Sequence, residues 1–149
     1  MTPATSGTTL GPDRPSAPVL VIDAANVVGS VPDGWWRDRA CAAMRLRDRL
    51  DRIAGSAAAD LRDSVIVLVV EGKARDIPDG ARVRVVRAPA SGDDEIVAEV
   101  GRRVRDGWSV TVVTSDRELR ARVAAAGAEK VRGARWLREA MSAAEAETP

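Results

Sequence analysis

The sequence predicts an α/β fold in which helices cover both faces of a parallel sheet. Two segments, SVIVLVVEG (64–72) and WSVTVVTSD (108–116), are rich in β-branched residues, as is typical of buried strands in parallel sheets. Amphipathic segments alternate with the apolar runs, which favours strand–helix–strand units. The 149 residues suit one domain. With no Phe or Tyr and four Trp, the core must be built mainly from Val, Leu, Ile and Ala.

The first expected elements are a short strand and a long helix. Val19–Ile22 is an apolar run suited to a buried strand. Beyond it, apolar residues recur at three- and four-residue steps, which predicts an amphipathic helix over Trp35–Ala57 beginning near Asp33 or Gly34. Its apolar face comprises Trp36, Ala40, Ala43, Leu46, Leu50, Ile53 and Ala57. We expect the Trp pair of this segment to lie in the core.

The rest of the chain alternates strands and helices. The strand at 64–72 is followed by Arg82–Pro89, a shorter strand whose alternating pattern places it nearer an edge. Then come a helix over Asp93–Arg105, the strand at 108–116, a helix over Glu118–Ala126 stopped by Gly127, a minor strand at Lys130–Val131 and a final amphipathic helix over residues 134–146. We expect the domain to span residues 18–142, between flexible tails at 1–17 and 143–149.

Composition excludes several classes of site. The absence of His removes Ser–His–Asp triads and imidazole zinc sites, and a single cysteine, Cys41, excludes an intrachain disulfide. The net charge of +1 means that affinity for a polyanion would need a local patch. No apolar run approaches the roughly 18 residues of a membrane span, and the first residues lack the pattern of a signal peptide. We therefore expect a cytoplasmic protein with no membrane partner.

Acidic residues follow the predicted strands at one edge of the sheet. Asp23 follows the first strand, Glu71 ends the second, Asp93 and Asp94 begin the helix after the third, and Asp116 follows the fourth. Each acid alone has a simpler explanation, such as capping a helix or bonding a turn. Ligands of open parallel sheets, however, bind at the carboxyl ends of the strands. Four strands that each deliver an acid to this edge therefore favour a shared site.

Such a cluster predicts a divalent cation. Two carboxylates about 4 Å apart repel by roughly 4 kcal/mol at an effective dielectric of 20, so clustered acids either protonate or gather a cation. Oxygen ligands without His or Cys favour Mg²⁺ or Mn²⁺ over zinc. Because Mg²⁺ often shares its shell with phosphate oxygens, the site indicates phosphate-ester chemistry.

Polar residues beside the acids fit this chemistry. Asn26 either orients a water or a phosphate, or only stabilises its turn. Ser115 and Thr114 offer hydroxyls beside Asp116. Lys73, Arg75 and Arg117 follow the second and fourth strands and are candidate substrate-binding residues at the same rim. Ordinary surface charge explains these three cations equally well.

Five segments resemble the NYN-domain branch of the PIN-like nucleases. They are VIDAANVVG (21–29), VVEGKAR (69–75), APASGDDEIVAEV (88–100), VTVVTSDRELR (110–120) and GARWLREAM (133–141). The resemblance runs from Val19 to Met141. The D-x-x-N motif after the first strand and the S-D motif after the fourth are fairly specific when they occur together.

The resemblance implies a PIN-like three-layer α/β/α sandwich with a mostly parallel sheet, and a ribonuclease that uses Mg²⁺ or Mn²⁺ to hydrolyse RNA. The family's catalytic positions fall on Asp23, Asn26, Asp94 and Asp116, of which the three acids would hold the metal. Asp93 and Glu71 are further metal candidates, although the family usually has Asp where Glu71 stands. Whether a protein partner captures the substrate, and in what oligomeric state, stays open.

Two alternatives remain. A module of the same fold could bind RNA or act as a scaffold without turnover. A metal-dependent phosphatase or nucleotide pyrophosphohydrolase would also gather acids, but Ala25 stands where one phosphatase class needs a second Asp after the first strand. Receiver-type domains need an acidic pair near the first strand, whereas Asp23 is a single acid.

Overall fold

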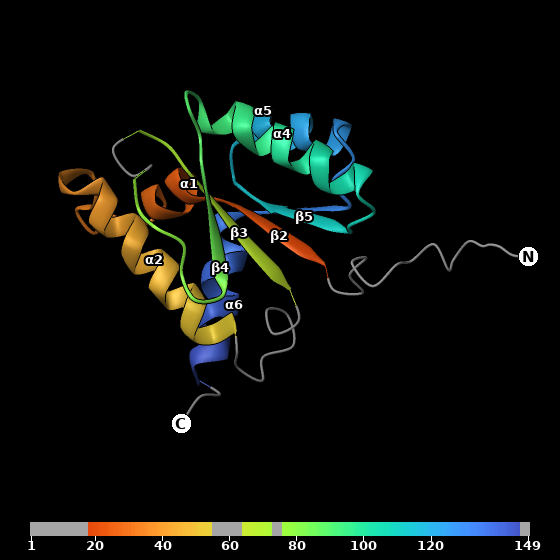
Figure 1. The fold of residues 1–149 in the computed structure, drawn as a ribbon. Helices are drawn as coiled ribbons and strands as arrows, with labels where there is room; N and C mark the ends of the chain where they lie inside the picture. Colours follow the sequence, from red (N-terminus) through yellow and green to blue (C-terminus); the bar gives the residue numbers. More distant parts are fainter. Residues whose placement is uncertain (1–17, 55–63, 73–75, 147–149) are drawn as a thin grey trace, which may run out of the picture.

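The computed structural model describes residues 18–54, 64–72 and 76–146, and it confirms the predicted α/β fold. Five strands form one sheet in the order β4-β3-β2-β5-β6, and all four pairings are parallel (Figure 1). The strands are β2 (Val19–Asp23), β3 (Val65–Val70), β4 (Val83–Arg87), β5 (Val110–Val113) and β6 (Lys130–Arg132). The segment at 82–89 is an edge strand, as its alternating pattern predicts.

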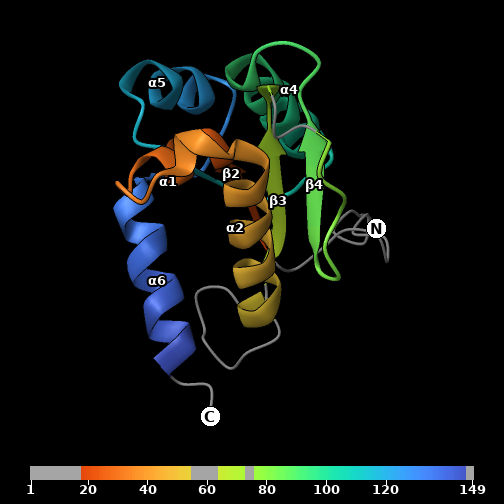
Figure 2. The same ribbon diagram turned by 90° about the vertical axis from the view of Figure 1, so that its left-hand side faces the viewer.

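Helices cover both faces of the sheet, as Figures 1 and 2 show. They are α1 (Ala24–Gly29), α2 (Arg39–Ala54), α4 (Gly92–Arg105), α5 (Arg117–Ala125) and α6 (Ala134–Ala146). Alternate residues of each strand point to opposite faces. Leu20 and Ile22 of β2 therefore pack in the cluster with α1, α2 and α6. Val19 and Val21 pack in the other cluster, with α4 and α5.

A short helix, α1, occupies a stretch that the sequence did not predict to be helical. It begins directly after β2 because Asp23 caps it, accepting the backbone N–H of Asn26 at 3.3 Å. Within this helix, Val27 is buried in the core. The site at the carboxyl end of β2 is therefore built on a helix start rather than on an irregular turn.

The predicted long helix begins later than expected. A separate 3₁₀ turn, η2 (Trp35–Arg37), precedes α2, whose first turn is capped by Asp38 through a 2.9 Å bond from the backbone N–H of Cys41. The expectation that Trp36 lies on the apolar face is wrong, since 53% of this residue is exposed. The predicted end at Ala57 lies outside the described residues.

Helix α6 continues past the predicted domain boundary at residue 142. It runs to Ala146 because Ala144 is buried in the core and Glu145 forms an ion pair with Arg49 of α2 at 2.6 Å. Residues 143–146 therefore belong to this packed helix, as the predicted helix over 134–146 requires, and not to a flexible tail. The expected tails at 1–17 and 147–149 lie outside the described residues.

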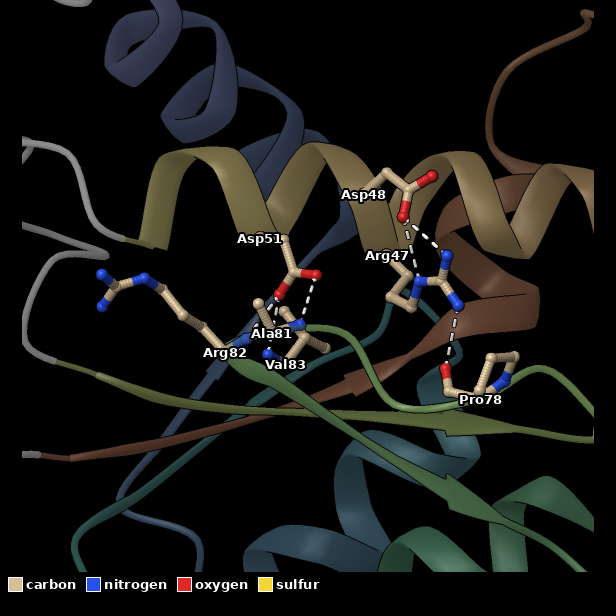
Figure 3. Close-up of polar contacts among 7 residues, drawn as sticks. All are labelled: Arg47, Asp48, Asp51, Pro78, Ala81, Arg82 and Val83. Atoms are coloured by element: carbon tan, nitrogen blue, oxygen red, sulfur yellow. Dashed lines mark hydrogen bonds and ion pairs between the residues drawn. The ribbon is translucent and has the colours of Figure 1, made fainter.

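Side chains of α2 close the outer edge of β4 at its start (Figure 3). Both Asp51 carboxylate oxygens accept backbone N–H groups, from Ala81, Arg82 and Val83, at 2.8–2.9 Å. A Cβ at Gly80 would overlap this carboxylate, so the close approach requires glycine there. Because these N–H groups are already bonded, the start of this edge strand offers little to another chain.

No helix among residues 18–54, 64–72 and 76–146 combines the length and the apolar character that crossing a bilayer requires.

Candidate functional site

Asp23 lies at the carboxyl end of the central strand and is the most enclosed acid of the candidate site. Only 6% of the residue is exposed. Burial raises the pKa of Asp23 above its ordinary value; hydrogen bonds from the Thr114 hydroxyl and the Asn26 backbone N–H oppose this, and the charges of Asp93 and Glu71 add to it. The surroundings of Asp23 therefore disfavour its ionised form. Acids whose pKa is shifted in this way are often found at functional sites.

The end of β5 supplies the partners that hold Asp23 in place. Thr114 is fully buried, and its hydroxyl donates to Asp23 Oδ2 at 2.9 Å. The Asn26 side-chain oxygen accepts the backbone N–H of Ser115 at 2.8 Å. Asn26 thus ties α1 to the chain leaving β5, so its carbonyl oxygen positions the site rather than facing a substrate.

Asp116 has a structural role beside its predicted chemical one. One carboxylate oxygen, Oδ1, caps α5 by accepting the backbone N–H of Leu119 at 2.9 Å. Its own backbone N–H donates to Thr114 Oγ1 at 3.2 Å, so the same hydroxyl contacts both Asp23 and Asp116. Asp116 is exposed at the rim, with Oδ2 available for a ligand.

At the start of α4, Asp93 rather than Asp94 belongs electrostatically with the other acids. Ser91 caps this helix, so neither acid is needed as its cap. Burial and the charges of Asp116 and Asp94 raise the pKa of Asp93, although Arg122 opposes them. Asp94 is 73% exposed and pairs with Arg122 of α5 at 2.9 Å.

Glu71, directly after β3, reaches the same region by lying against the start of α4. Its Oε1 occupies the space that a Cβ on Gly92 would need, and Gly92 is buried. Glycine at this position therefore admits the longer acidic side chain to the helix start, where it adds to the charge felt by Asp23. We name Asp23, Glu71, Asp93 and Asp116 the acid cluster.

The acid cluster has the kind of ligand atoms that a hard divalent cation prefers, but its side chains are not arranged as a complete coordination shell. It offers only carboxylate oxygens, and the mutual repulsion of its members would be relieved by a cation. Yet in the described ranges no three acids stand in an arrangement that could hold a metal ion. Direct ligation by Asp23, Asp94 and Asp116 together, or by Glu71 or Asp93, stays a prediction.

The structure describes two of the four predicted substrate-binding residues, Ser115 and Arg117, and gives them different positions. Lys73 and Arg75 lie outside the described residues. The Ser115 hydroxyl accepts the backbone N–H of Ala134 at 2.9 Å and so anchors the start of α6. Arg117 is exposed at the first position of α5, beside Asp116, where a polyanion could reach it.

Thr114 and Arg122 matter more than the sequence indicated. The sequence marks Thr114 only as a hydroxyl near Asp116, and its contact with Asp23 arises because β2 and β5 are neighbours in register. The sequence signal for this contact was that Asp23 and Thr114 each directly follow an apolar run. Nothing local indicates the pairing of Arg122 with Asp94, because the two residues lie on different helices.

Crystal structures of one bacterial protein share this fold. A mutant form of Rae1 (YacP) from Bacillus subtilis superimposes with a TM-score of 0.72 at 18% sequence identity, covering 87% of this chain and 77% of that chain. Rae1 (YacP) without that mutation gives a TM-score of 0.67 at 18% identity, over 86% and 75% of the two chains. The fold is PIN-like. The predicted α/β/α sandwich is thereby confirmed, and at this identity the likeness concerns the fold alone.

Neither protein-family models nor curated proteins yield a match to this chain.

Proposed function

We propose that this protein is a divalent-metal-dependent ribonuclease of the NYN-domain branch of the PIN-like fold. One observation carries the proposal: acids from the ends of separate strands act on one another electrostatically, and Asp23 at the centre is buried. Burying like charges together costs free energy, which a bound cation would offset. The likeness to Rae1 (YacP) and the motif resemblance of residues 19–141 support the same assignment.

Each residue of the site would have a distinct task. Asp23, Asp93 and Asp116 would hold Mg²⁺ or Mn²⁺, with Glu71 contributing directly or through water. When bound, the ion would supply an activated water and offset the negative charge of the phosphodiester. Thr114 and Asn26 orient the chain around Asp23 through the bonds described above. Arg117, at the rim, would contact the RNA backbone.

Cleavage of labelled RNA by the purified full chain with Mn²⁺ tests the proposal. We expect cuts that leave 5′-phosphates and a loss of at least roughly 100-fold in rate for Asp116→Asn, beyond what removing an outer partner costs. Asparagine is as good a helix cap as aspartate, so this variant keeps the start of α5. Cleavage that survives Asp116→Asn unchanged would contradict the assigned site.

A matched pair of variants decides which acid of α4 is used. The motif resemblance selects Asp94, whereas burial and charge favour Asp93. We expect Asp93→Asn to lose at least roughly 100-fold in rate and Asp94→Asn to lose less than roughly 100-fold, as for an outer partner. The reverse order would return the metal-binding role to Asp94.

An RNA-binding module without turnover is the second candidate. It is favoured by the finding that, of the acids in the described ranges, no three are grouped as a metal site. RNA binding with no Mn²⁺-dependent cleavage by the wild-type protein would select it.

A further inference from the structure

A small pocket opens beside the acid cluster, between α1, α2 and the end of β3. Its volume is about 140 Å³. The walls are small or apolar: Ala24, Ala25, Val28, Ala43 and Val70. Pockets for drug-sized ligands measure about 300–1,000 Å³, so this one suits a single ring system rather than a whole nucleotide.

The pocket is joined to the acid cluster in two ways. Glu71 lines the pocket and also belongs to the cluster. Ala24, in the pocket wall, directly follows Asp23 in the chain. A group seated in the pocket therefore contacts Glu71, the member of the acid cluster through which the pocket and the cluster meet.

The polar groups at the pocket suit a nucleobase. The Glu71 carboxylate can accept from the N–H groups on the edge of a base, and the exposed Arg39 brings a cation to the wall. The apolar walls supplied by α1 and α2 can bury the face of a flat ring.

A larger cavity of about 190 Å³ lies between α1, α2 and α6, but it suits a ligand less well. None of the acid cluster lines it. Arg49, in its wall, is already bonded to Glu145, and Arg138 to Ser30.

We propose that the pocket between α1 and α2 receives one unstacked base of a single-stranded RNA and so places the adjoining phosphate at the acid cluster. This inference rests on the proposed function for its substrate. A base inside a duplex is paired and stacked and does not enter such a pocket, so the pocket selects single strands.

Binding of a labelled single-stranded RNA decamer in EDTA tests the pocket without cleavage. The decamer is compared with the same ribose-phosphate chain carrying no bases, by fluorescence anisotropy. Wild-type protein should bind the intact RNA roughly tenfold more tightly than the abasic chain, the scale expected from burying the apolar face of one base. Ala25→Leu fills the pocket from an exposed helical position, and it should bind both chains equally.

Ala143→Leu is the matched control, an exposed alanine near the far end of α6, and it should keep the wild-type preference. An Ala25→Leu protein that retains the full preference, or a wild-type protein that shows none, would overturn the pocket assignment. Adding Mn²⁺ to the same mixtures separates the two proposals. If the preference depends on Ala25 but no RNA is cut, the proposed ribonuclease function fails and the base pocket stands.

Discussion

Replacing Thr114 by valine tests the hydrogen bonds that hold Asp23 in its buried position. The Thr114 hydroxyl donates to Asp23 Oδ2 at 2.9 Å and accepts the backbone N–H of Asp116 at 3.2 Å. Valine has nearly the same shape and an equal preference for extended backbone, but it can neither donate nor accept. Thr114→Val therefore leaves a buried carboxylate short of one donor and a backbone N–H short of its acceptor.

The expected loss in the free energy of unfolding is about 2–4 kcal/mol near neutral pH. A hydrogen bond to a charged group contributes about 1.5–3 kcal/mol, and one between neutral groups about 0.5–1.5 kcal/mol. Because the Thr114 bond lowers the pKa of Asp23, removing it should raise that pKa further. The stability difference between wild type and variant should therefore shrink as pH falls through the pKa of Asp23, where the carboxyl becomes protonated.

Urea unfolding at neutral and acidic pH measures this difference. Thr111→Val is the control, because Thr111 is a half-buried residue of the same strand, β5, and its hydroxyl has no bond to Asp23 that the structure describes. We expect the control to change stability by less than about 1 kcal/mol. A Thr114→Val variant that is as stable as the control, or equally destabilised at both pH values, would refute the role assigned to this hydroxyl.

Two further predictions concern acids with opposite effects on stability. Asp51→Ala should lower the free energy of unfolding by about 1.5–3 kcal/mol, because three backbone N–H groups at the start of β4 lose a charged acceptor. Asp48→Ala, one turn away in Figure 3, should lower it by less than about 1 kcal/mol, since the Asp48 side chain is half exposed and its ion pair is with Arg47 of the same helix. Equal losses from the two variants in urea unfolding would contradict this account. Asp23→Asn should abolish cleavage yet stabilise the fold at neutral pH: the pKa of Asp23 is raised, so its ionisation destabilises the folded state above that pKa and has no effect below the unfolded value. Thermal unfolding of wild type and variant across pH checks the sign of this stability difference. A variant less stable than wild type at neutral pH would show that the hydrogen bonds to the Asp23 carboxylate contribute more than its burial costs.

Much of the fold could be predicted because it is encoded locally. The apolar runs at 64–72 and 108–116 match β3 and β5, and the edge strand β4 was recognisable from its alternation. Helix α1 could not be predicted from the pattern because it has only six residues. Its N-terminal cap, Asp23, is also a candidate site residue, so the sequence does not distinguish the two roles. Trp36 was misplaced because periodicity cannot reveal that Asp38 starts a new helix after a 3₁₀ turn.

The edge of the sheet that collects the acids follows from residue order alone, because parallel strands that end in Asp or Glu must deliver them to the same side. The relation of these acids to one another depends on how the chain packs in three dimensions. Asp93 and Asp94 are neighbours in the chain, yet the direction of α4 brings Asp93 under the influence of Asp116 while Arg122 of α5 takes Asp94. Side-chain direction depends on how helices pack across the sheet, and residue order alone does not contain that information.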